Sequence, residues 1–166
     1  MPGKLRRLRR PPRIKVLEAA GALGDGRVIL TSSQPGLVVA RVVSSDASRE
    51  YQVVVSRRGP SVLHVYSNDN GTVYRGYVGY PIIAVMMVAG ILPRDSGVED
   101  SLKGIPWREL NEKFKKYSLV EEYIRKSLGD GDAWRRIEDF REKVLRELAR
   151  LTLYYDKGLI RGASTP

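Results

Sequence analysis

The feature that most constrains the fold is the stretch from residue 49 to residue 84, where β-rich runs alternate with turn signals. Runs at 49–56, 61–67 and 72–77 are rich in Val and Tyr and alternate in polarity, as half-buried strands do. Residues 57–60 (RRGP) and 68–71 (NDNG) separate them, and Asn-Gly between β-rich runs is a strong hairpin signal. We therefore expect an antiparallel sheet at the centre of the chain.

Two further β-rich runs, 27–32 and 37–44, extend this sheet to a meander of four or five strands. Helices are predicted at 14–23, where a strand at 14–17 is the alternative, at 98–102 and at 107–128. Residues 82–92 are apolar on nearly all sides, which predicts a buried helix. Because a sheet this small cannot bury enough apolar surface alone, we expect an α+β fold with helices packed on one face.

A long C-terminal helix is predicted over residues 132–155. Ile137, Val144 and Leu151 are spaced by seven residues, but Glu147 interrupts the heptads of a strict zipper. The apolar stripe can pack on the sheet domain or on another subunit, and the pattern leaves both open. The expected organisation is a flexible basic arm (1–11), an α+β nucleic-acid-binding domain (12–128), this helix (129–155) and a tail (156–166).

Positive charge is concentrated at the start of the chain. The net charge is +10, and the first 15 residues hold seven Lys or Arg and no acid. A polyanion is the natural partner of such a segment, although a solubilising tail is the alternative.

The absence of Cys excludes disulfides and thiolate metal sites, and fits a cytoplasmic protein. The longest apolar run, 82–89, is far shorter than the ~20 residues that a membrane helix needs, and no secretory signal is apparent. We expect no membrane association.

Alternation along the predicted strands assigns side chains to faces of the sheet. Pairing Ser56 with Ser61 and treating 68–71 as a hairpin places five aromatic or basic residues on one face with several valines, and an odd-length loop at 45–49 adds Arg41 to them. The six residues are Arg41, Tyr51, His64, Tyr66, Arg75 and Tyr77.

If that face is open, its rings can stack on unpaired bases and its arginines can neutralise phosphates. Arg13, Lys15, Arg57 and Arg58 complete the set of predicted nucleic-acid-binding residues. The alternative is that the tyrosines are ordinary sheet residues covered by the helices.

Three strings resemble a known family: residues 12–16 (PRIKV), 70–84 (NGTVYRGYVGYPIIA) and 103–107 (KGIPW) are similar to the ThermoDBP-related proteins of hyperthermophilic archaea. The resemblance covers roughly residues 11–128. It implies a small antiparallel sheet backed by helices, a homo-oligomer such as a dimer or tetramer, and binding of single-stranded DNA with RNA as a further ligand.

No pattern for catalysis, a metal or a cofactor stands out. His64 is the only histidine and has no residues placed for a triad or a zinc site. Residues 68–71 lack the downstream Glu of a calcium loop, and 21–26 lack a nucleotide-binding pattern. We therefore predict a non-enzymatic, largely sequence-independent binder of single-stranded DNA; an RNA-binding protein, an RNase-like enzyme using His64, and a scaffold are the alternatives.

Overall fold

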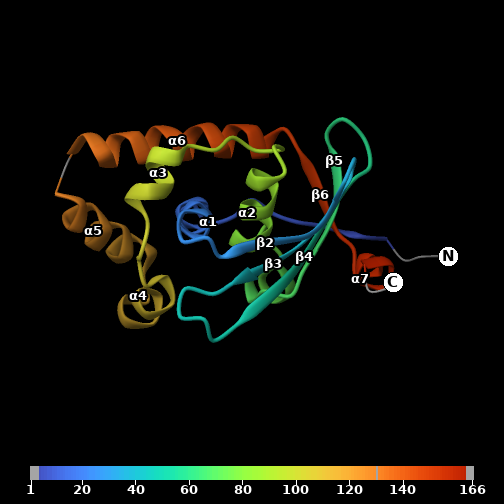
Figure 1. The fold of residues 1–166 in the computed structure, drawn as a ribbon, viewed down its shortest axis with the longest axis horizontal. Helices are drawn as coiled ribbons and strands as arrows, with labels where there is room; N and C mark the ends of the chain where they lie inside the picture. The colour runs from blue at the N-terminus through green and yellow to red at the C-terminus, as the bar shows by residue number, and fades with distance from the viewer. Residues whose placement is uncertain (1–3, 130, 164–166) are drawn as a thin grey trace.

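The computed structural model describes residues 4–129 and 131–163 and confirms the α+β class (Figure 1). One mostly antiparallel six-stranded sheet has the strand order β1-β6-β5-β4-β3-β2. Its strands are β1 (Arg6–Arg7), β2 (Val28–Gln34), β3 (Leu37–Val43), β4 (Glu50–Arg57), β5 (Val62–Ser67) and β6 (Thr152–Tyr155). The β5–β6 pair is parallel, and the other pairs are antiparallel.

The helices gather on one face of the sheet, which we call the inner face (Figure 1). They are α1 (Ile14–Gly24), α2 (Tyr80–Val88), α3 (Ser96–Ser101), α4 (Trp107–Phe114), α5 (Tyr117–Leu128) and α6 (Gly131–Ala149). A short π-helix, η1 (Gly71–Arg75), lies between β5 and α2. Helix α7 (Gly158–Ala163) packs against β4 and β5 from the opposite, outer face.

The core forms between the inner face and α2. Alternate residues of β3, β4 and β5 point inward and are buried, among them Val42, Val53 and Leu63. Helix α2 has no polar face, and Ile82 and Met86 are fully buried in it. This confirms the prediction of a buried helix, since a helix apolar on all sides must be enclosed.

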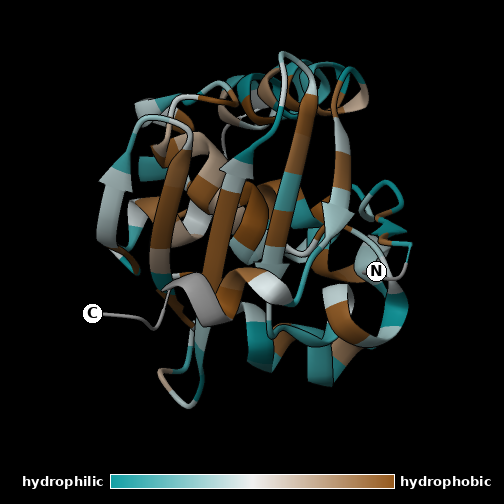
Figure 2. Cartoon of the chain, turned by 90° about the vertical axis from the view of Figure 1, so that its right-hand side faces the viewer, coloured by the Kyte–Doolittle hydropathy of each residue, from teal (hydrophilic) through white to brown (hydrophobic). Residues whose placement is uncertain are grey.

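The outer face is only partly covered. Figure 2 views the molecule from the side of α7, with apolar segments along the strands behind it. Val54 and Ser56 of β4 are buried there, whereas Ile29 and Leu37 near the far edge stay exposed.

The strand predicted at 72–77 is wrong, because this segment forms η1. The Asp69 carboxylate accepts hydrogen bonds from the Thr72 backbone N–H (3.1 Å) and hydroxyl (2.8 Å), and so starts a helical turn. Capping by Asp69 therefore overrides the hairpin signal of residues 68–71.

The long C-terminal helix is confirmed, but it ends at Ala149 and not at residue 155. Thr152–Tyr155 form β6, which takes the place beside β5 that the hairpin pattern predicts for 72–77. Leu148, Leu151 and Tyr155 keep a helical spacing by coincidence, and this spacing conceals the strand.

Two further boundaries differ. The predicted flexible arm is wrong for residues 6–9, because β1 pairs with β6 and Leu8 is buried. The helix predicted at 107–128 is two helices, since Lys115 takes a left-handed conformation (φ 58°) between α4 and α5.

Candidate nucleic-acid interface

The six residues predicted to share one sheet face do not share it. Ser56 pairs with His64, not with Ser61, because the last pair of the ladder is Arg57 with Leu63, which leaves the five residues 58–62 between them instead of the assumed four. A change in register moves every side chain of a strand relative to its neighbour. Arg41 pairs with Gln52, so the assumed β3–β4 register is wrong as well.

The register divides the six residues into three places. Arg41, His64 and Tyr66 lie on the outer face, Tyr51 lies on the inner face, and Arg75 and Tyr77 lie outside the sheet ladder in and after η1. On the outer face, Arg41 is paired with Glu50 (2.8 Å) and the His64 Nδ1 contacts the Asp156 carboxylate (2.9 Å). Glu50 and Asp156 therefore make the contacts to Arg41 and His64 that phosphates would make on an open face.

The other predicted residues are also dispersed. Arg13 forms an ion pair with Glu142 of α6, and Arg57 and Arg58 are exposed at the β4–β5 loop. Lys15, in contrast, lies with Tyr51, Arg75 and Tyr77 along one cavity of about 470 Å³.

We call this cavity the tyrosine cleft. It forms where α1, the β3–β4 loop, η1, the start of α2 and α4 meet. Its lining includes Lys15, Glu18, Ser44, Arg49, Tyr51, Asp69, Arg75, Tyr77, Tyr80, Trp107, Arg108 and Asn111.

A buried ion pair forms one wall of the cleft. The Lys15 ammonium contacts a Glu18 carboxylate oxygen (2.8 Å) one turn along α1, and the Asn111 amide donates to the other oxygen (3.3 Å). Burial would lower the pKa of Lys15, but the charge and hydrogen bond of Glu18, with smaller contributions from Tyr77 and Tyr117, together hold that pKa above its ordinary value. The buried Asn111 Oδ1 has no hydrogen-bond partner within the described part of the chain, so it can accept from a ligand.

Tyrosine rings form a second wall. Tyr51 and Tyr80 meet edge to face with their centroids 6.1 Å apart. Burial raises the pKa of all three tyrosines of the cleft, that of Tyr77 to about 12. Tyr77 packs on η1 so closely that a Cβ at Gly71 would collide with its ring. The rings are therefore neutral and held in place.

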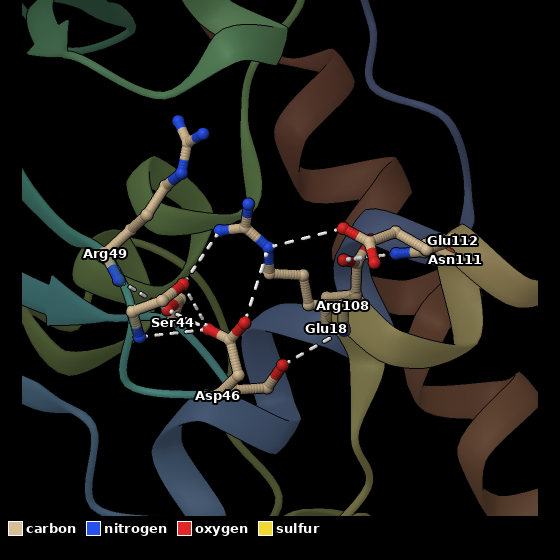
Figure 3. Close-up of polar contacts among 9 residues, drawn as sticks. Glu18, Ser44, Asp46, Arg49, Arg108, Asn111 and Glu112 are labelled. Atoms are coloured by element: carbon tan, nitrogen blue, oxygen red, sulfur yellow. Dashed lines mark hydrogen bonds and ion pairs between the residues drawn. The ribbon is translucent and has the colours of Figure 1, made fainter.

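The β3–β4 loop forms the rim (Figure 3). Asp46 accepts from the hydroxyls of Ser44 (2.8 Å) and Ser48 (2.7 Å), and the bonds from Ser48 hold its pKa well below the usual range. Arg108 of α4 lies 3.5 Å from Asp46 and donates to the Ser48 hydroxyl. In Figure 3 the Arg49 guanidinium points away from this network and from its acids.

A basic ridge continues from the cleft. We define the arginine ridge as Arg6, Arg7, Arg9, Arg10, Tyr74 and Arg75, all exposed, from β1, the residues after it and η1. Arg6 donates to the Thr72 carbonyl (2.8 Å), and Arg9 donates to the Arg75 carbonyl. The first residues of the chain therefore fix η1, and Arg75 connects the ridge to the cleft.

The ridge presents free cations beside an exposed ring. Arg7, Arg10 and Arg75 form no ion pair within residues 4–129 and 131–163. The Tyr74 side chain is 81% exposed. Arg6 also lies over the Tyr155 ring, which stacks on Tyr66 at 5.9 Å. Such a surface can attract phosphates and stack on unpaired bases.

Several of these residues are not singled out by the sequence pattern. The predicted strand places Tyr74 on the opposite face, and Glu18, Arg49 and Asn111 are absent from the predicted set. Lys15 and Glu18 carry an i, i+3 signal that could have found their pair. No local signal brings Asn111 of α4 to α1.

The comparisons with known proteins add a family without a described activity. A family model described as "Uncharacterised conserved protein UCP014422" matches residues 8–154. No curated protein and no solved structure matches the chain. Among the described residues, no helix has the length and apolar character to span a membrane, and no group of His, Asp or Glu is arranged to hold a metal.

Proposed function

The chain belongs to the family described as uncharacterised conserved protein UCP014422, and we propose that it binds single-stranded nucleic acid, DNA in the first place, without catalysing a reaction on it. The observation that carries the proposal is the arginine ridge. An aromatic ring that is 81% exposed lies beside arginines that have no acidic partner among the described residues, next to a cleft walled by tyrosines. The resemblance to ThermoDBP-related proteins of hyperthermophilic archaea favours the same function.

In this proposal a single strand lies along the ridge. One base stacks on Tyr74 while Arg7, Arg10 and Arg75 neutralise neighbouring phosphates. Stacking needs no base-specific hydrogen bond, so binding is largely independent of sequence. Arg75 belongs both to the ridge and to the lining of the cleft, so a nucleic-acid strand on the ridge reaches the cleft at this residue. Tyr51 and Tyr77 also line the cleft. We place this activity in the cytoplasm, in keeping with a chain without Cys.

The test is a titration of a labelled single-stranded oligonucleotide with the wild type and with Tyr74→Ala. Removal of one stacking platform should cost about 1–3 kcal/mol, or roughly 5- to 150-fold in Kd. Tyr123→Ala is the matched control, because Tyr123 is also exposed but lies on α5. Replacing Arg7 and Arg10 by Gln should also flatten the salt dependence, by about 0.7 in slope for each phosphate that is no longer neutralised.

Wild-type affinity and salt slope in all these variants would overturn the proposal. Repeating the titration with RNA and with duplex DNA identifies the preferred strand. A paired replacement of Arg57 and Arg58 by Gln tests whether the β4–β5 loop also contacts the strand.

An RNase-like enzyme is the second candidate, and the contact between His64 and Asp156 favours it. A carboxylate can orient a histidine for proton transfer. Prolonged incubation with labelled RNA, for the wild type and His64→Ala, separates the two candidates. Intact RNA at saturating protein rejects the enzyme, whereas cleavage that His64→Ala abolishes supports it.

A further inference from the structure

The two edge strands of the sheet differ in how they are protected. β1 at one edge has two residues, Arg6 and Arg7, and a short, charged strand discourages pairing with another chain. β2 at the other edge has seven residues, Val28–Gln34, without a single charge. Its apolar side chains Ile29 and Leu30 are 39% and 42% exposed. Long, uncharged and apolar edges are the ones that accept a further strand.

The sequence from β2 into β3 is uncharged as well, and Arg41, which pairs with Ile29 across the ladder, is held in an ion pair with Glu50. Residues 28–40 carry no Lys, Arg, Asp or Glu, although the chain has a net charge of +10. Leu37, which pairs with Gln34 at the other end of β2, is a further exposed apolar side chain near this edge. Two copies of so basic a chain repel each other at most approaches, and a contact along the uncharged β2 adds no charge of that strand to the repulsion.

We propose that β2 is the interface between two copies of this chain, with each β2 pairing antiparallel with the other across a two-fold axis. The two six-stranded sheets then continue into each other. An antiparallel copy is complementary to the backbone groups of its own strand, so no other partner is required. Since β1 lies at the opposite edge, both arginine ridges stay uncovered.

One local feature limits the strength of this pairing. The register between β2 and β3 shifts between Leu30 and Ser32, and the Thr31 hydroxyl donates to the Val39 carbonyl of its own sheet (3.0 Å). A bulge interrupts the ladder that a second strand can form. The dimer is therefore reversible and depends on protein concentration.

Sedimentation over a range of concentrations tests the proposal. The wild type should move from the mass of one chain, 18.6 kDa, towards twice that mass. Ile29→Lys should stay at the mass of one chain, because each copy then brings a charge into an edge that has none. Leu119→Lys, an equally exposed apolar position on α5, should behave like the wild type. Circular dichroism shows that each variant is folded.

A covalent test does not depend on these masses. Because the chain has no Cys, Ser32→Cys introduces the only thiol, at a partly exposed position of the edge. Oxidation should give a disulfide-linked dimer far faster than for Leu119→Cys. A wild type that remains a single chain at every concentration, or Ile29→Lys that dimerises as the wild type does, would overturn the proposal.

Discussion

At the scale of single residues, the charges in the cleft depend on burial. Lys15 keeps its charge because Glu18 lies 2.8 Å away and Asn111 holds the other carboxylate oxygen. Breaking a buried ion pair by removing one partner is strongly destabilising, since the remaining charge is left without compensation. For Tyr51, Tyr77 and Tyr80, burial raises the pKa of the phenol and so keeps these side chains neutral.

These groups predict a loss of stability in alkali. The pKa values of Tyr77 and Lys15 are higher in the folded chain than in the unfolded chain. For each group, the folded chain therefore binds more protons at a pH between its unfolded and folded pKa values. The contribution of Tyr77 is complete below about pH 10 and is lost as the pH rises through about 12, whereas the contribution of Lys15 persists to higher pH. Urea unfolding from pH 8 to pH 12 should show this fall.

Tyr77→Phe is the control for that experiment, because its ring cannot ionise. The fall in the free energy of unfolding should be smaller in this variant. An identical pH dependence in the two proteins would show that Tyr77 does not contribute.

Residue type is a better guide to the site than predicted position. Basic or aromatic character selects Lys15, Tyr51, Arg75 and Tyr77 from the sequence, and all four line the cleft. The reason for grouping them, a shared sheet face, is wrong because loop lengths set the register. Asn111 and Glu18 belong to helices far apart in sequence, and their contact depends on the tertiary packing of α4 on α1.

At the scale of elements, η1 depends on one carboxylate. Asp69 accepts hydrogen bonds from Ser67, from the Thr72 hydroxyl and from the Thr72 backbone, and the Thr72 hydroxyl accepts from the Gly79 N–H (3.1 Å). A Cβ at Gly79 would collide with the Asp69 carboxylate. The absence of a side chain at Gly79 therefore lets α2 start directly beside η1.

Gly79→Ala should lower the free energy of unfolding by about 1–3 kcal/mol, because the added methyl group displaces the Asp69 carboxylate. Gly131→Ala is the matched control, since a Cβ there meets no atom within 4 Å and Ala favours the helix. Urea unfolding of both variants measures the difference. Equal stabilities would contradict the role given to this contact.

Most elements follow from local pattern, and the exceptions have local causes. The helices α1 and α2 and the four strands β2 to β5 lie within a few residues of their predicted bounds. The pattern misses η1 because a hairpin signal and a capping carboxylate occupy the same four residues. It misses β6 because a strand this short shows no period that differs from that of the preceding helix.

At the scale of the whole molecule, β6 joins the two ends of the described chain. It pairs with β1 on one side and with β5 on the other, and Leu153 is buried between them. The sequence predicts the class of fold, because alternating strands and an apolar helix require it. It does not predict this strand order, since a parallel neighbour to β5 arrives only after helices α2 to α6.

Truncation distinguishes the roles of the last two elements. Removal of residues 152–166 deletes β6, exposes Leu8 and Leu63, and should leave a chain without cooperative unfolding. Removal of residues 157–166 deletes α7 and only uncovers part of the outer face, so the shortened chain should still fold. Thermal unfolding followed by circular dichroism compares them; cooperative unfolding of the chain without β6 near the wild-type temperature would contradict this view.

The position of β6 also has a consequence for biosynthesis. During translation β5 emerges from the ribosome about 90 residues before β6, by the usual vectorial order of synthesis. Through that interval the nascent sheet ends in an open β5 edge carrying Leu63 and Val65, both fully buried in the finished protein. Closure of this long loop is slow compared with local helix formation. We therefore expect the nascent chain to bind chaperones until β6 has been synthesised.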